Sequence, residues 1–110
     1  MVNQSLKKGS AELLILSLLE DGSRHGYEIA KLIEIRSGGR IQFRVSSLYP
    51  VLYRMEQRGW TKGRWVERSG QRRRRYHRLT NSGKQALARQ RSAWRELTLA
   101  VNLIVEPSHA

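Results

Sequence analysis

The residues with the clearest chemical potential are the basic side chains of the segment 62–78. Eight basic residues stand there against one acidic residue, Glu67, so the segment holds seven of the twelve net positive charges of this 110-residue chain. Four arginines are consecutive, and like charges at this density repel one another unless an anion lies nearby. Such groups bind phosphate oxygens through charge-assisted hydrogen bonds. The alternative is a solvated run of charges that protects a strand edge from pairing. The side chains that we predict to bind nucleic-acid phosphates are Lys62, Arg72, Arg73, Arg74 and Arg75.

A second polar group lies on the stretch Val45–Gly59, which is predicted to form an amphipathic helix. Leu48, Val51, Leu52 and Met55 recur at the spacing of one buried helical stripe. The opposite face carries hydroxyls, phenols and an arginine, which suit phosphates and base edges. Alone, the pattern also fits an ordinary amphipathic helix, but the neighbouring arginines favour contact with DNA. The predicted DNA-facing side chains are Ser46, Ser47, Tyr49, Tyr53 and Arg54, with Arg54 the candidate for a base edge.

The ends of this helix are predicted from residues with special backbone properties. Ser46 and Ser47 are both suited to cap its first turn, and if Ser47 is the cap, Pro50 falls where a missing N–H has no energetic consequence. Gly59 is expected to end the helix in a left-handed conformation.

Other kinds of chemistry find little support in the sequence. His25, His77 and His109 lack the spacing of metal ligands, the chain has no cysteine, and no nucleotide-binding or nucleophile motif occurs. We therefore expect no enzyme activity, no metal and no cofactor. The formal charge of +12 indicates nucleic acid first and an anionic membrane second. No apolar run approaches the roughly 18 residues of a membrane span, so we expect a cytoplasmic protein without a membrane partner.

Further elements are predicted around these two groups. Residues 1–9 are expected to form a mobile or loosely helical arm, followed by a largely buried helix, Ala11–Glu20, capped by Ser10. A second helix is expected at Gly26–Ser37. The alternation of Arg40–Val45 predicts a short strand. Two further runs, 60–67 and 73–79, predict a hairpin in which Trp65 lies opposite Tyr76.

The last predicted helix begins after Thr80, its expected N-cap, and runs to about Val105. At about 1.5 Å per residue it is long for so small a protein. Its apolar residues form a seam of heptad type, which predicts a homodimer through this helix. The alternative is a helix that folds back on its own core. The predicted interface residues are Leu87, Trp94, Leu97, Val101 and Ile104.

This order of elements predicts an α+β, mainly α fold: a winged helix-turn-helix with a long C-terminal dimerisation helix. The expected domains are an N-terminal arm (1–9), a winged-helix DNA-binding domain (10–79), the dimerisation helix (80–105) and a tail (106–110). A helix fits the major groove of double-stranded DNA, which is about 12 Å wide. Two copies about a two-fold axis would address an inverted repeat.

Several motifs taken in order also resemble the PadR-type transcriptional regulators, over about residues 11–87. These are Leu14–Leu19, His25–Ile29, Ser47–Leu52 leading to Glu56–Gly59, and the arginine run into Tyr76–Thr80, with Gly83 before Leu87. The chain is similar to the short form of the family, without a separate C-terminal domain. It departs from the family at Asn81-Ser82, where acidic residues are more common.

The resemblance implies a bacterial repressor that binds palindromic operators as a dimer, with half-sites of the ATGT/ACAT type. It also implies release of DNA when a small aromatic or drug-like effector binds. Trp94 is expected to be an interface anchor first, and the resemblance adds a role in an effector pocket.

The predicted function is therefore that of a sequence-specific DNA-binding transcriptional regulator, expected to be a ligand-responsive repressor. Two alternatives remain at this point. One is a small basic RNA-binding or ribosome-associated protein, although the aromatic residues are not arranged as a stacking sheet. The other is a winged-helix module for protein interaction, which would leave the charge of the hairpin unexplained.

Overall fold

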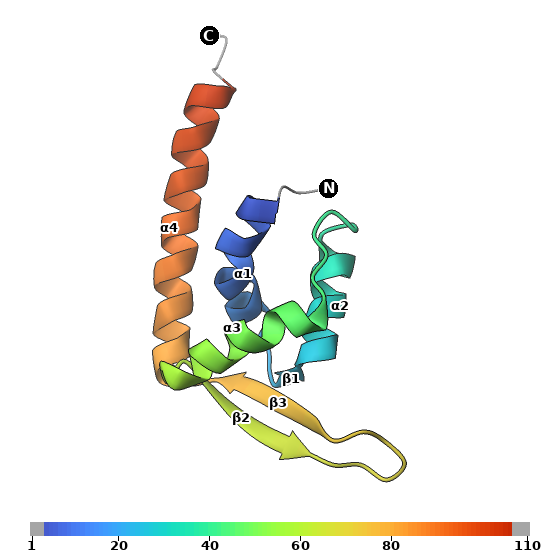
Figure 1. Ribbon diagram of the computed structural model, residues 1–110. Helices are drawn as coiled ribbons and strands as arrows, with labels where there is room; N and C mark the ends of the chain where they lie inside the picture. The colour runs from blue at the N-terminus through green and yellow to red at the C-terminus, as the bar shows by residue number, and fades with distance from the viewer. Residues whose placement is uncertain (1–3, 107–110) are drawn as a thin grey trace.

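The computed structural model describes residues 4–106 and confirms a mainly helical winged helix-turn-helix. Three helices surround the core, a small sheet lies along one side of them, and a long helix follows (Figure 1). The elements in chain order are α1 (Gln4–Leu18), β1 (Arg24–His25), α2 (Gly26–Arg36), α3 (Val45–Gln57), β2 (Thr61–Val66), β3 (Arg74–Leu79) and α4 (Asn81–Val105).

The core joins α1, α2 and α3, and α4 adds Ala86 and Leu87 to it. The stripe predicted for α3 is confirmed, because all four of its apolar residues are buried. Burial of a large apolar side chain contributes about 1.5–3 kcal/mol, so this stripe fixes which face of α3 points outward. The largest fully buried side chains are Ile15, Leu16, Leu19, Ile29, Leu48, Leu52 and Met55.

The first helix begins earlier than predicted. α1 starts at Gln4 and ends at Leu18, so the predicted limits Ala11–Glu20 are wrong at both ends. Ser10 is not a cap, because its hydroxyl lies inside the helix and donates to the carbonyl oxygen of Lys7 at 2.9 Å. The predicted arm is helical from residue 4, and its residues 1–3 lie outside the described part. The helical pattern of apolar residues starts only where α1 meets the core, so the sequence before that point does not indicate where the helix begins.

The strand predicted at Arg40–Val45 is absent, and that prediction is wrong. Residues 40–44 form neither a helix nor a strand, and Ile41 and Phe43 pack against the core. The third strand is instead β1, which pairs with β3, so the sheet order is β1-β3-β2. The alternating apolar pattern therefore belongs to a half-buried segment that connects α2 to α3. The two residues of β1 are too few to show such a pattern.

The hairpin is confirmed, but its predicted register is wrong by one residue. Trp65 pairs with Arg75, and Arg64 pairs with Tyr76. Because successive side chains of a strand point to opposite faces, Trp65 and Tyr76 lie on different faces of the sheet. This shift decides which charges of the hairpin meet α3.

The start of α3 also differs from the prediction. Arg44 occupies the N-cap position without a side-chain hydrogen bond, and Ser47 is already helical. Pro50 therefore falls in the second turn, where proline removes one intrahelical hydrogen bond. Gly59 follows the helix with φ of 76°, which confirms the predicted left-handed stop.

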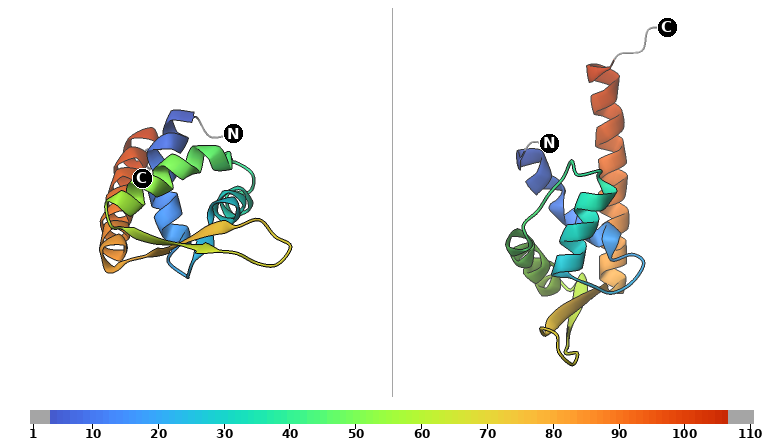
Figure 2. Two further views of the ribbon diagram at one scale, coloured as in Figure 1. Left: turned by 60° about the horizontal axis from the view of Figure 1, so that its bottom comes forward. Right: turned by 90° about the vertical axis from the view of Figure 1, so that its right-hand side faces the viewer.

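The long helix α4 has the predicted cap and length. The hydroxyl of Thr80 accepts from the backbone N–H of Gly83 at 3.0 Å, and the helix continues for 25 residues. Its first half packs beside α1, and its second half projects beyond the rest of the molecule (Figures 1 and 2). Within residues 4–106, no helix combines the length and apolar character that a membrane crossing requires.

Candidate nucleic-acid interface

The outer face of α3 carries all five side chains predicted to face DNA. Ser46, Ser47, Tyr49, Tyr53 and Arg54 are each exposed, and Tyr53 retains 65% of its accessible surface. They lie opposite the buried stripe, so burial of that stripe turns these groups toward solvent. The structure therefore gathers hydroxyl, phenol and guanidinium groups on one helical face, free to reach phosphates or base edges.

The angle between α2 and α3 depends on Gly26. A Cβ atom at this position would lie 3.0 Å from Cε1 of Tyr49 and 3.2 Å from Cγ2 of Val45. The start of α3 thus packs directly on the backbone of α2. Next to it, Nδ1 of His25 accepts from the N–H of Glu28 at 3.3 Å and caps α2. One edge of the Tyr49 ring packs on this contact between α2 and α3, and the other edge is exposed to solvent.

The arginines of the wing, defined as residues 61–79, have different surroundings. Arg73 lies over the ring of Trp65, with 4.5 Å from Cζ to the ring centroid. Arg74 lies over Tyr27 of α2 at 4.8 Å. Arg72 is exposed near the turn. Cation–π contacts of this kind place the guanidinium while its N–H groups stay available. The aromatic partners were not foreseen, because each depends on the register or on α2.

Arg75 is bound to α3. Its Nε and Nη2 donate to the two carboxylate oxygens of Glu56 at 3.1 and 2.7 Å. These hydrogen bonds hold the pKa of the Glu56 carboxyl below its ordinary value, and burial opposes that shift. Across the hairpin, a Cβ at Gly63 would lie 2.5 Å from Nε of Arg75, so the guanidinium occupies the space that glycine leaves open. Neither Glu56 nor Gly63 was predicted to belong to the site, because only the strand register connects them.

His77 lies behind this ion pair. It is 5% exposed, its Nδ1 lies 3.5 Å from Oε1 of Glu56, and that nitrogen makes no hydrogen bond. Burial lowers the pKa of His77, and Arg75 lowers it further, whereas Glu56 acts in the opposite direction. The neutral imidazole is therefore the form that the fold favours.

A hollow of about 500 Å³ separates the wing from α3. Its lining combines aromatic rings with the ion pair just described: Tyr49, Leu52, Tyr53, Glu56, Trp65, Arg75 and His77. Lys62, predicted with the wing arginines, does not line this hollow. It pairs with Arg78 on the opposite face of the sheet, so the structure does not bring it beside α3.

The seam on α4 falls into two parts. Leu87 is 3% exposed and belongs to the core of its own protomer. Trp94, Leu97, Val101 and Ile104 are exposed, at 50, 55, 42 and 81%. A smaller hollow of about 210 Å³ lies between α1 and α4, lined by Gly9, Ser10, Leu13, Gln90, Ala93, Trp94 and Leu97. In the part of the chain that the structure describes, no group of three or more acidic, histidine or cysteine side chains could hold a metal ion.

The polar helix, the basic wing and the three-helix core define a winged-helix DNA-binding protein. The model of the transcriptional regulator PadR-like family matches residues 15–89, and the chain belongs to this family. Members of this family are DNA-binding transcriptional regulators rather than enzymes. Membership favours the predicted DNA-binding function over the RNA-binding alternative.

Solved structures agree with this assignment. A transcriptional regulator from Clostridium thermocellum is 28% identical, with a TM-score of 0.87, over 96% of this chain and 100% of that one. A PadR family regulator from Clostridium difficile is 34% identical, with a TM-score of 0.73, over 88% and 99%. Bacillus subtilis PadR, solved in complex with operator DNA, is 28% identical with a TM-score of 0.66, over 72% of this chain and 45% of that one.

Proposed function

We propose that this regulator is a repressor that binds an inverted-repeat operator as a homodimer, with α3 in the major groove. The observation that carries the proposal is the exposed polar face of α3, turned outward by the buried stripe on its other side. The wing lies beside that face and supplies arginines for the backbone. The complex of Bacillus subtilis PadR with operator DNA supports this choice of partner.

Selection of bound duplexes from a random pool at moderate salt tests this proposal. The expected product is two inverted half-sites, of the ATGT/ACAT type that the family resemblance implies, separated by about one helical turn or a multiple of it. Enrichment without any shared sequence, or of a single unrepeated site, would contradict it. Placing the selected operator upstream of a reporter gene separates repression from activation.

The dimer is proposed from the projecting half of α4. This half projects beyond the rest of the protomer (Figure 2), and it carries exposed apolar side chains. A second copy would remove this surface from water. Sedimentation should therefore give the mass of two chains, and Leu97→Glu should give a single chain because the introduced charge would be buried. The control Glu96→Gln, on the same helix, should retain the dimer.

The effector is proposed as a planar aromatic compound that stacks on Trp94. This residue is half exposed and borders the hollow between α1 and α4. Titration of a panel of planar compounds should change tryptophan fluorescence in the wild type but not in Trp94→Phe, which retains the emission of Trp60 and Trp65. A response of equal size in both proteins would exclude this site.

A further inference from the structure

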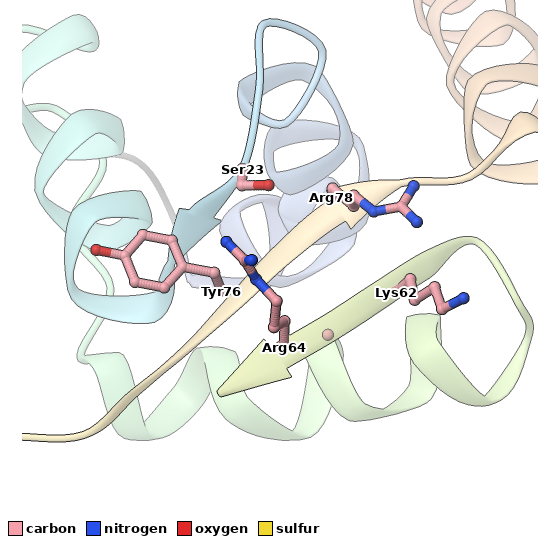
Figure 3. A pocket seen from close by; sticks show the side chains of 6 residues that line it. Ser23, Lys62, Arg64, Tyr76 and Arg78 are labelled. Atoms are coloured by element: carbon pink, nitrogen blue, oxygen red, sulfur yellow. The ribbon is translucent and has the colours of Figure 1, made fainter. Parts of the chain in front are cut away.

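Three basic side chains of the hairpin lie on the sheet face that points away from α3. Paired residues of neighbouring strands share a face, and Lys62 pairs with Arg78 while Arg64 pairs with Tyr76. Arg75 lies on the other face, where it meets Glu56. We call the surface formed by Lys62, Arg64, Tyr76 and Arg78 the outer sheet face. A hollow of about 450 Å³ on it is lined by these residues together with Ser23 and Gly63 (Figure 3).

The charge of the outer sheet face has no counterpart in the fold. Among residues 4–106, no salt bridge involves Lys62, Arg64 or Arg78, and no carboxylate lines the hollow. Lys62 lies directly across the strand pair from Arg78, an arrangement of like charges that destabilises a hairpin. On the sheet face that points toward α3, by contrast, Glu56 neutralises Arg75. The outer sheet face therefore has the electrostatic character of an anion site.

The arrangement of these cations indicates an extended anion. In Figure 3 the guanidinium of Arg64 lies near Tyr76 and Ser23, whereas Arg78 and Lys62 extend toward the other end of the hairpin. Positions 62 and 64 are about 7 Å apart along the strand, at about 3.4 Å per residue. Cations distributed in this way fit several linked phosphate groups better than one. The side chain of Ser23 adds a hydroxyl donor for phosphate oxygens.

We propose that the outer sheet face is a second phosphate-binding site whose ligand is the backbone of DNA flanking the half-site. The inference rests on the proposed function, because it requires α3 to hold the operator. It assigns to the hairpin two separate contacts with DNA. Arg72, Arg73 and Arg74 contact the half-site, and Lys62, Arg64 and Arg78 contact the duplex beyond it. Sequences outside the operator then contribute affinity without contributing base readout.

Two lengths of the selected operator duplex test the site. The short duplex ends at the outer edges of the half-sites, and the long one extends about ten base pairs further on each side, roughly one helical turn. On the long duplex, Arg64→Gln/Arg78→Gln should lower the slope of log affinity against log salt by about 2, at roughly 0.9 per phosphate contact. On the short duplex the variant and the wild type should have equal slopes.

The matched control is Arg36→Gln/Arg89→Gln, which removes two exposed charges outside the hairpin and should leave both slopes unchanged. Binding of the short duplex by the wild type reports on the proposed function, and the difference between the two lengths reports on the outer sheet face. Equal slopes for wild type and variant on the long duplex would overturn the inference, and so would equal losses on both lengths. If free tripolyphosphate bound to the wild type but not to the variant, with the long-duplex slope unchanged, the site would belong to a free phosphate compound.

Discussion

The guanidinium of Arg75 and the carboxylate of Glu56 form two parallel hydrogen bonds, at 3.1 and 2.7 Å, that connect β3 to α3. This pair connects the strand that carries the wing arginines to the helix that we propose enters the major groove. Arg75 therefore differs from the three arginines that precede it, because its charge is already neutralised within the protein. Its contact with Glu56 positions the wing relative to α3.

The ion pair leads to a prediction about stability. Glu56→Gln and Arg75→Gln should each lower the free energy of unfolding by about 1 kcal/mol, since the pair is partly exposed. The double variant should cost less than the sum of the two. Because the folded-state pKa of Glu56 is lowered, the contribution is present above the ordinary carboxyl pKa and is lost as the pH falls through the folded-state pKa. Urea titrations at pH 7 and pH 3 measure both effects, and additive costs at pH 7 would show that the pair is not coupled.

Gly63→Ala should reproduce the loss of this ion pair. The added Cβ would occupy the position of the Arg75 guanidinium, a flexible group that can move away only by leaving Glu56. We expect a loss of about 1 kcal/mol that largely disappears in the background Glu56→Gln. Thermal unfolding of the four proteins tests this dependence. Gly9→Ala is the control, because a Cβ there meets nothing within 4 Å, and helix propensity should make it stabilising by roughly 0.5–1 kcal/mol.

His77 should make the fold sensitive to mild acid. Its pKa is lowered chiefly by burial, so the folded state binds a proton less readily than the unfolded chain. Stability is therefore complete above the ordinary histidine pKa of about 6.5, and declines as the pH falls from there through the lower folded-state pKa. The charged groups facing this imidazole are Glu56 of α3 and Arg75, and Arg24 of β1 is its cross-strand neighbour.

The measurement is an NMR titration, in which the ring protons of His77 should shift at lower pH than those of a histidine in an unfolded peptide. His25 also has a lowered pKa, from burial and from Arg74, so the two imidazoles must be assigned separately. His77→Gln should remove the matching part of the decline in melting temperature between pH 7 and 5. A midpoint for His77 at or above 6.5 would contradict the prediction.

The helix and the wing should have separable effects on DNA binding. Arg54→Ala removes the candidate base contact, so it should relax sequence preference by about 1–3 kcal/mol at one position of the half-site. Arg74→Ala should weaken all duplexes about equally and reduce the salt slope by about one unit. Binding isotherms on the selected operator and on single-base variants, at several salt concentrations, distinguish the two. The same profile for both variants would refute this division of roles.

The sequence alone determined the helices, the hairpin, the family and the outward face of α3. These depend on local patterns: the apolar stripe with Leu48 and Met55, the cap at Thr80, the left-handed stop at Gly59, and the charge of the hairpin. Each is a property of residues close together in the chain, and burial of the stripe leaves one orientation for the helix.

Only the tertiary structure decided how the charges of the hairpin are divided between the two faces of the sheet. A one-residue change of strand register moves side chains to the other face of a sheet, and no local pattern fixed that register. The register places Arg75 on Glu56 above Gly63, buries His77 behind them, and leaves Lys62 with Arg78 on the outer sheet face. Packing brings together residues that are distant in sequence. The ion pair and the outer sheet face could therefore be identified only from the folded structure.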